Sequence, residues 1–165
     1  AAQMRELLAA LENLDDTHLI FTMPNADTGN RELSDMIGTF VMAHANVHAY
    51  ESLGQLRYLS MLKCVDGVIG NSSSGLAEAP SMGVGTVNIG DRQKGRLRAS
   101  SVIDCPPQRD AIRAAIERLY SPEFRQTLAA TSNPYGNGGA SGQIARILKE
   151  HSLDGILMKA FHDLA

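Results

Sequence analysis

The chain has 165 residues, of which 44% are hydrophobic and 20% charged, and its formal net charge is −3. This composition is typical of a globular domain with a sizeable core, and it excludes a disordered chain. The negative net charge gives no reason to expect nucleic-acid or membrane binding, so any attraction for an anionic ligand must be local.

Cysteine usage and hydropathy indicate a protein of the cytoplasm. Cys64 and Cys105 lack a short metal-ligand spacing, and two thiols do not make a disulfide framework. No apolar run is long enough to span a membrane and no signal peptide is recognisable, so we expect a cytoplasmic protein. The chain begins in a helical pattern without an initiating Met, and we expect it to be cut from a longer protein.

Hydrophobic periodicity predicts strands that alternate with helices. In the first half we expect a helix over 2–14, a strand at 18–22, a helix over 30–43, a strand at 46–50 and a helix capped by Ser52. Further strands are predicted at 67–70, 86–89 and 101–104, with helices over 76–83, 108–120, after Pro122, 140–150 and 154–164.

This alternation predicts one α/β domain over 1–165, a parallel sheet with helices on both faces. Ligands of such sheets bind beyond the carboxyl ends of the strands. The loops at Pro24, Ser52, Ser72 and Asp91 all follow strands, so we expect them along one rim.

The segment from Val68 to Pro80 carries the strongest functional signal. A short apolar run ends in Gly-Asn-Ser-Ser-Ser-Gly at 70–75, and a helix-compatible segment follows at once. At a helix start, unpaired N–H groups and the positive end of the dipole favour an anion. A simple helix cap, the alternative, needs one hydroxyl, whereas this loop offers three. The spacing matches neither common phosphate fingerprint.

Two charged features indicate that the anionic ligand is a nucleoside diphosphate. Glu78 would repel a phosphate, but its two oxygens suit a sugar diol. The alternative is a helix-dipole acid, worth about 0.3–1 kcal/mol. From Arg92 to Arg98 every second residue is basic, so an extended segment would point all four cations one way. Arg92 is the first choice for a ligand contact, and a solvated basic loop is the alternative at Arg98 and Arg96.

Residues that could perform acid–base chemistry are not evident. None of the five histidines stands beside a Ser or Cys in nucleophile–base spacing, and none has zinc-ligand spacing. The Asn133-Pro134-Tyr135-Gly136 loop is interpreted as a structural turn with the Tyr135 hydroxyl paired. We therefore expect a binding rim with no catalytic residue, no metal and no cofactor.

These motifs, in this order, resemble the C-terminal half of a hydrolysing UDP-N-acetylglucosamine 2-epimerase of the sialic-acid pathway. The resemblance rests on 70–81 and 87–98, with support from 21–27, 52–55 and 133–136. It implies a Rossmann-like domain, the C-terminal half of a GT-B fold, that binds UDP or a UDP-sugar. The residues that it implies for this site are Ser72, Ser73, Ser74, Gly75, Glu78, Arg92, Asn25 and Ser52.

Within that site, the resemblance implies that Ser72 and Ser73 take the diphosphate with the loop amides, and that Glu78 takes the ribose hydroxyls. Arg92 would also face the nucleotide, Asn25 would face the cleft, and the backbone near Ser52 would read uracil. Gly85 departs from the family pattern, in which Pro is usual, and we expect a looser turn there. Asn137 stands where Asp is usual, which puts any charge-dependent role of that loop in doubt.

In this family the enzyme eliminates UDP across the sugar C1–C2 bond to give a 2-acetamidoglucal, and water addition releases N-acetylmannosamine. The acids and bases come mainly from the N-terminal half. The resemblance thus implies that the isolated chain is inactive, needs that half as its partner and forms a homo-oligomer when full length. The helix around Leu157 and Phe161 would pack across the N-terminal half; without that half, its apolar face would be exposed or would pair with another copy.

Three alternatives stay open. The first is a non-hydrolysing epimerase, against which the Gly-Asp-Arg-Gln-Lys-Gly-Arg run argues. The second is a retaining GT-B glycosyltransferase, which would need a paired-glutamate nucleotide motif that is not found around Glu78. The third is a stand-alone nucleotide-binding module without catalysis.

Overall fold

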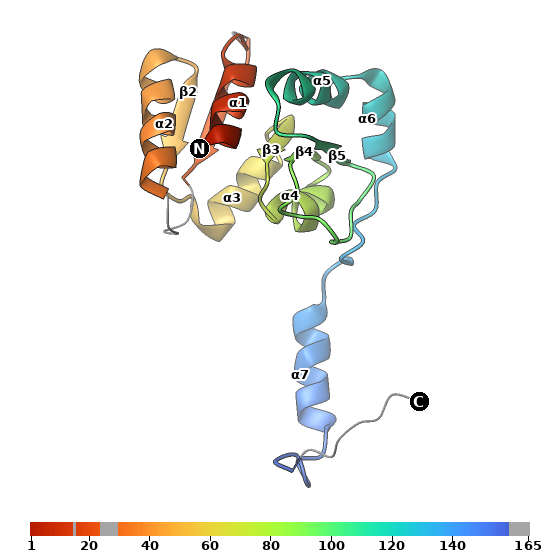
Figure 1. The fold of residues 1–165 in the computed structure, drawn as a ribbon. Helices are drawn as coiled ribbons and strands as arrows, with labels where there is room; N and C mark the ends of the chain where they lie inside the picture. Colours follow the sequence, from red (N-terminus) through yellow and green to blue (C-terminus); the bar gives the residue numbers. More distant parts are fainter. Residues whose placement is uncertain (15, 24–29, 159–165) are drawn as a thin grey trace. The chain divides into compact units, whose positions relative to one another are not determined.

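A computed structural model describes residues 1–14, 16–23 and 30–158. The chain divides into two compact units, 1–135 and 136–165, and one domain over 1–165 stays a prediction. Strands and helices alternate through the first unit as predicted (Figure 1). Its elements are α1 (Ala2–Leu11), β1 (Leu19–Thr22), α2 (Asn30–Ala43), β2 (Val47–Tyr50), α3 (Gly54–Leu62), β3 (Gly67–Gly70), α4 (Ser74–Ala77), η1 (Ala79–Met82), β4 (Gly85–Ile89), β5 (Val102–Cys105), α5 (Arg109–Leu119) and α6 (Pro122–Ala129).

The strand pairs of the described residues are all parallel, which confirms the predicted α/β class. The strands form two hydrogen-bonded sheets, β1-β2 and β3-β4-β5. Leu19 pairs with Val47 in the first sheet, and Val87 lies between Ile69 and Ile103 in the second. Figure 1 shows α5 and α4 on opposite sides of the second sheet, so β4, the central strand, is buried throughout.

One hydrophobic core joins the two sheets. Helix α1 packs against both α2 and α5, and its residue Leu11 is buried in the same cluster as Phe40, Val87 and Ile112. Because apolar surface from both sheets is removed from water in one cluster, the first unit folds around a continuous interior.

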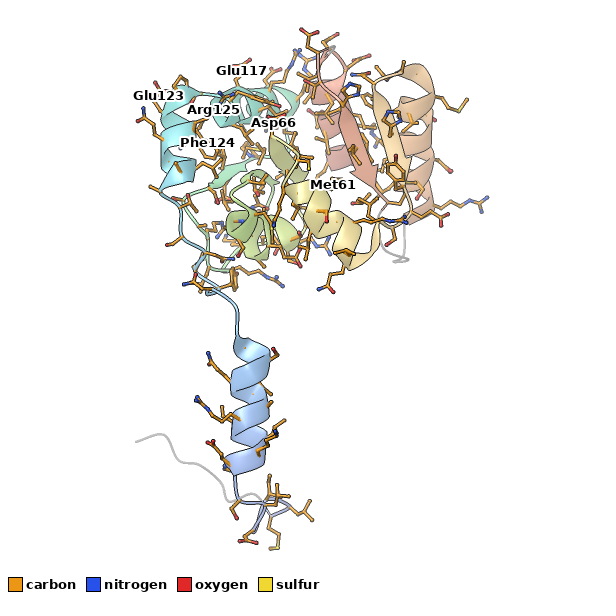
Figure 2. The ribbon with its side chains drawn as sticks, turned by 180° about the vertical axis from the view of Figure 1, so that it is seen from behind. Met61, Asp66, Glu117, Glu123, Phe124 and Arg125 are labelled. Carbon is orange, nitrogen blue, oxygen red and sulfur yellow. The ribbon has the colours of Figure 1, made fainter. Side chains whose placement is uncertain are left out.

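Helix α6 closes one end of this core (Figure 2). Ser121 accepts a hydrogen bond from the Phe124 N–H at 3.2 Å and Pro122 occupies the first turn, as expected of a helix start. The Phe124 ring is 4% exposed and lies so close to Gly85 that a Cβ there would come within 2.6 Å of Phe124 Cε1. Gly85 is therefore required by packing, whatever its effect on the preceding turn.

The second unit contains α7 (Ala140–Glu150), which agrees with the predicted helix over 140–150. The helix predicted over 154–164 is wrong over 154–158, where the chain forms turns, and 159–164 lie outside the described residues. Gly155 has φ of 72°, a left-handed conformation that does not continue a helix. The Ser152 hydroxyl also bonds both the Asp154 N–H and its carboxylate, which stabilises a local turn.

Candidate functional site

A groove of about 1940 Å³ lies in the first unit, lined mainly by β1, α3, β3 and the loops that follow β3 and β4. Its lining contains every predicted site residue that the structure describes: Ser52, Ser72, Ser73, Ser74, Gly75, Glu78 and Arg92. Asn25 lies outside the described residues. The fold thus brings together residues that are up to 40 positions apart, between Ser52 and Arg92.

The three hydroxyls of the Ser loop, which we define as residues 71–74, differ in their availability. Ser72 Oγ accepts from the Ser74 N–H at 3.4 Å, and the Ser74 hydroxyl pairs with the Tyr58 hydroxyl at 2.6 Å. Among the described residues, the Ser73 hydroxyl and the N–H groups of Ser72 and Ser73 have no hydrogen-bond partner. Ser72 and Ser73 are exposed, so these groups can receive a ligand, whereas the Ser74 hydroxyl is already engaged.

The helix after the loop is shorter than predicted. Instead of one helix over 76–83, α4 spans four residues and a 3₁₀ turn, η1, follows. Pro80 accounts for the change, because proline has no N–H to donate and its ring does not fit the interior of an α-helix. So short a helix has a small dipole, and attraction for an anion must come mainly from the loop N–H groups and neighbouring cations.

Gly75 serves packing rather than close approach of a ligand. A Cβ at this position would lie 2.6 Å from Thr86 Cγ2 on β4. The Thr86 hydroxyl donates to the Gly75 carbonyl at 2.9 Å, and both residues are buried. This contact packs α4 against the central strand, β4, and thereby positions the Ser loop relative to that strand.

The basic segment, residues 91–98, is not extended, so the condition under which its four cations would point one way is not met. Consecutive turns join the Lys94 N–H to the Asp91 carbonyl and the Arg96 N–H to the Gln93 carbonyl. Arg92 and Arg96, four residues apart, both line the groove, and Lys94 does not belong to the lining. The groove therefore has two arginines near the Ser loop.

Arg98 has a structural partner instead of a ligand role. Its Nε lies 2.9 Å from Asp104 Oδ2 on β5, and Asp104 Oδ1 accepts from Asn88 Nδ2 at 2.6 Å. Arg98 also donates to the Gln93 carbonyl at 3.3 Å. The guanidinium thus ties the basic segment to the end of the second sheet.

Two groups near these elements have perturbed acidity. Burial raises the pKa of the Cys105 thiol, and the adjacent Asp104 carboxylate raises it further. Burial also raises the pKa of the Tyr120 hydroxyl in the groove lining; Asp66 adds to the effect and Arg125 opposes it (Figure 2). Both shifts favour the neutral form of the side chain.

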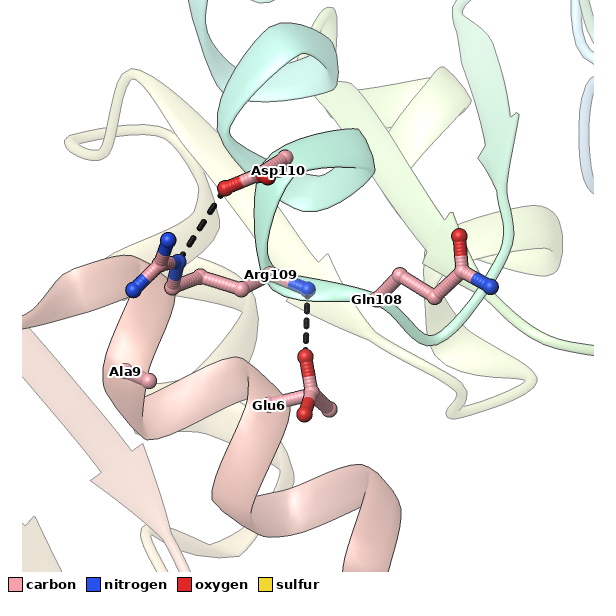
Figure 3. A pocket seen from close by; sticks show the side chains of 5 residues that line it. All are labelled: Glu6, Ala9, Gln108, Arg109 and Asp110. Carbon is pink, nitrogen blue, oxygen red and sulfur yellow. Dashed lines mark hydrogen bonds and ion pairs between the residues drawn. The ribbon is translucent and has the colours of Figure 1, made fainter.

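A second, smaller pocket of about 430 Å³ lies where α1 meets α5 (Figure 3). Glu6 on α1 accepts a hydrogen bond from the Arg109 N–H at 2.7 Å, at the start of α5. The N-cap residue Gln108 makes no side-chain cap of its own. A carboxylate from another helix thus caps α5, a role that sequence spacing could not show because Glu6 and Arg109 are 103 positions apart.

Over residues 1–14, 16–23 and 30–158, no cluster of three His, Cys, Asp or Glu side chains could hold a metal ion. The helices within these ranges include none that is both long and apolar enough to cross a membrane. In the Asn133 loop the Tyr135 hydroxyl is paired, as predicted: it donates to the Leu97 carbonyl at 3.1 Å. The ring itself is exposed rather than packed.

Comparison with known proteins gives one consistent family. The model of the family described as UDP-N-acetylglucosamine 2-epimerase matches residues 1–149. A GDP/UDP-N,N'-diacetylbacillosamine 2-epimerase (hydrolyzing) of Campylobacter jejuni is 38% identical over 164 residues, which cover 98% of this chain and 42% of the relative. The polysialic acid biosynthesis protein P7 of Escherichia coli is 43% identical over 152 residues, or 90% of this chain and 38% of the relative.

Solved structures agree on the fold. The S. aureus MnaA–UDP co-structure has a TM-score of 0.72 at 19% identity, with 90% of this chain and 42% of that chain covered. The Neisseria meningitidis UDP-GlcNAc 2-epimerase bound to UDP-GlcNAc has a TM-score of 0.69 at 20% identity, with 91% and 41% covered. The chain therefore spans about two fifths of the length of its relatives, and the resemblance inferred from its motifs is confirmed.

Proposed function

The chain belongs to the UDP-N-acetylglucosamine 2-epimerase family, and from this premise we propose that it is the UDP-binding half of a hydrolysing 2-epimerase. One observation carries the proposal: Ser72, Ser73, Glu78 and Arg92 line the same groove. A hydroxyl-rich loop, a carboxylate and a cation in one groove match the phosphates and the ribose diol of a nucleoside diphosphate.

Each group has a defined part in binding. The unpartnered N–H groups of Ser72 and Ser73 donate to the diphosphate, and so do the two hydroxyls, of which Ser72 Oγ also accepts from the Ser74 N–H. Arg92 and Arg96, which line the same groove, offset its negative charge. Glu78 is exposed on the groove, where its oxygens accept the ribose hydroxyls, and the backbone near Ser52 reads uracil.

In the complete enzyme, this half holds the leaving group. Loss of the proton at the sugar C2 and departure of UDP from C1 give the 2-acetamidoglucal, and addition of water gives N-acetylmannosamine. Donors that neutralise charge building on the departing diphosphate stabilise the transition state of the elimination. The acids and bases belong to the N-terminal half, so we expect no turnover from this chain alone. We further propose a cytoplasmic, homo-oligomeric full-length enzyme of sialic-acid synthesis.

Binding of UDP by this half does not identify the sugar of the substrate. Relatives named for N,N'-diacetylbacillosamine match this chain at 38% and 34% identity. Because the nucleotide is common to both sugars, the UDP site of this half does not select between N-acetylglucosamine and a diacetamido sugar. We propose UDP-N-acetylglucosamine as the substrate of the complete enzyme.

Thermal unfolding with and without UDP tests the proposal. A ligand at 100 times its Kd stabilises a folded protein by about 2.7 kcal/mol, so UDP should raise the Tm of the wild-type chain. Arg92→Ala and Glu78→Ala should weaken this rise. Lys94→Ala is the matched control, because Lys94 belongs to the same segment but not to the groove lining.

Two results would contradict the assignment. One is a Tm that does not change at millimolar UDP, and the other is a Lys94→Ala variant that responds as weakly as Arg92→Ala. The inactivity of the isolated chain is checked separately with UDP-N-acetylglucosamine. Release of N-acetylmannosamine that survives purification and disappears in Glu78→Ala would show that catalysis does not lie elsewhere.

A further inference from the structure

Two amide side chains from distant loops donate hydrogen bonds to the two ends of the segment that carries Ser72, Ser73 and Glu78. Gln93 Nε2 donates to the Asn71 carbonyl at 2.7 Å across 22 positions. Asn133 Nδ2 donates to the Ala77 carbonyl at 2.8 Å across 56 positions. We propose that Gln93 and Asn133 are positioning residues that preset this segment for a nucleoside diphosphate, an inference that rests on the proposed function.

Gln93 controls the direction of the Ser72 N–H. The carbonyl of Asn71 and the N–H of Ser72 belong to one planar peptide unit, in which they point in opposite directions. A donor that holds the Asn71 carbonyl therefore fixes the Ser72 N–H on the other side, and that N–H has no partner among the described residues. This N–H is left for the diphosphate.

Stability alone does not explain a glutamine at this position. Gln93 is 3% exposed, and its Oε1 is buried without a hydrogen-bond partner in the described part of the chain. A buried unsatisfied oxygen is costly, and an apolar side chain of similar size would avoid that cost. What an apolar side chain cannot do is hold the Asn71 carbonyl.

Asn133 performs the matching task at the other end. In a regular helix the Ala77 carbonyl would accept from the N–H of residue 81, but the Ser81 N–H bonds to the Glu78 carbonyl in the 3₁₀ turn. Asn133 supplies the missing donor to Ala77 and also donates to Ser81 Oγ at 2.6 Å. Glu78 joins α4 to η1 between these two contacts, so Asn133 sets the backbone from which the Glu78 carboxylate projects.

The two ends should consequently affect different parts of the nucleotide. Loss of the Gln93 contact loosens the amides proposed for the diphosphate. Loss of the Asn133 contact displaces the carboxylate proposed for the ribose diol. A general disturbance of the groove would not distinguish one part of the nucleotide from another.

Titration calorimetry on the folded chain separates these cases with UDP, 2′-deoxy-UDP and uridine as probes. Gln93→Met keeps the side-chain volume and removes the donor; we expect about three- to tenfold weaker UDP binding, the range of one neutral hydrogen bond, with uridine unchanged. Asn133→Asp keeps the acceptor for the Tyr135 N–H but has no donor for Ala77. Its preference for UDP over 2′-deoxy-UDP should fall towards one.

Asn46→Asp is the matched control. Asn46 Nδ2 makes the same kind of contact, to the Leu14 and Thr17 carbonyls, at the start of β1. This variant should lower the Tm and leave all three affinities unchanged. Gln93→Leu and Asn133→Ala, which also remove the donors, replace either first variant if it does not fold.

The outcomes distinguish the two levels of inference. If the wild-type chain does not bind UDP, the proposed function is wrong. If it binds UDP and prefers it to 2′-deoxy-UDP, but folded Gln93 and Asn133 variants bind all three probes as the wild type does, the positioning role is wrong. Equal weakening of UDP, 2′-deoxy-UDP and uridine would overturn it as well, because neither contact would then act on one part of the nucleotide.

Discussion

Replacement of Gly75 by Ala should destabilise the first unit although it improves the local helix. Alanine is favoured over glycine inside a helix by about 0.8–1.0 kcal/mol. The new methyl would, however, lie 2.6 Å from Thr86 Cγ2 and 3.4 Å from Thr86 Oγ1, distances at which something must move. Thr86 is 2% exposed on the central strand, so it has little room to move.

The magnitude follows from the opposing terms. Overpacking of a buried contact costs about 1–3 kcal/mol. The hydrogen bond from the Thr86 hydroxyl to the Gly75 carbonyl, about 0.5–1.5 kcal/mol, is strained by the same movement. The gain in helix propensity offsets part of these two costs. We therefore expect the free energy of unfolding to fall by about 1–3 kcal/mol. The Ser loop moves with α4, so UDP binding should weaken too.

Urea unfolding followed by circular dichroism measures the change, and two variants sharpen it. Gly38→Ala is the matched control on α2, because nothing lies within 4 Å of its Cβ position; it should stabilise by about 0.4–1 kcal/mol. Adding Thr86→Ser to Gly75→Ala removes the methyl that clashes and keeps the hydroxyl. The pair should show a favourable coupling of about 0.5–3 kcal/mol.

The reasoning would be refuted if Gly75→Ala were as stable as the wild type, since the propensity gain would then have met no opposing contact. It would also be refuted if Thr86→Ser gave no recovery in the double variant. In that case the loss would arise from something other than the methyl–methyl contact between α4 and β4.

Two further predictions concern stability. Glu6→Ala removes the acceptor for the Arg109 N–H and should lower the free energy of unfolding by about 0.5–2 kcal/mol in urea titrations. Glu12→Ala, at the C-cap position of the same helix, should stay within about 0.5 kcal/mol of the wild type. Cys105 has a folded-state pKa raised above its ordinary value of 9.0, so its stabilising effect is complete below that pH and is lost as pH rises through the folded pKa. Cys105→Ala should therefore flatten the fall of stability above pH 9, measured as the urea midpoint against pH, whereas Cys64→Ala, at an exposed thiol, should not; an equal slope in both variants would contradict this assignment.

Much of the fold could be predicted from local pattern. In the described part of the first unit, the spacing of apolar residues located the strands and most of the helices to within a few positions, because burial on one face of an element depends only on its own period. The helix predicted over 76–83 is the exception, since it divides into α4 and η1. The Gly-rich end of β3 located the Ser loop, since Gly70 has φ of +147°, a conformation that other residues rarely adopt. The prediction of a helix over 154–164 is wrong over 154–158. It relied on amphipathic spacing and gave too little weight to Gly155, whose left-handed backbone does not continue a helix.

The sequence by itself determined the parallel α/β class and the set of residues, from Ser72 to Arg92, that gathers on one groove. The tertiary structure alone decided which of the basic residues face that groove, because Arg98 turns to Asp104. It also decided that Glu6 caps α5 and that Gln93 and Asn133 hold the ends of the Ser72–Glu78 segment. The reason is one of range: periodicity and turn chemistry act over a few residues, whereas these contacts join residues 6 to 103 positions apart and exist only after the elements have packed.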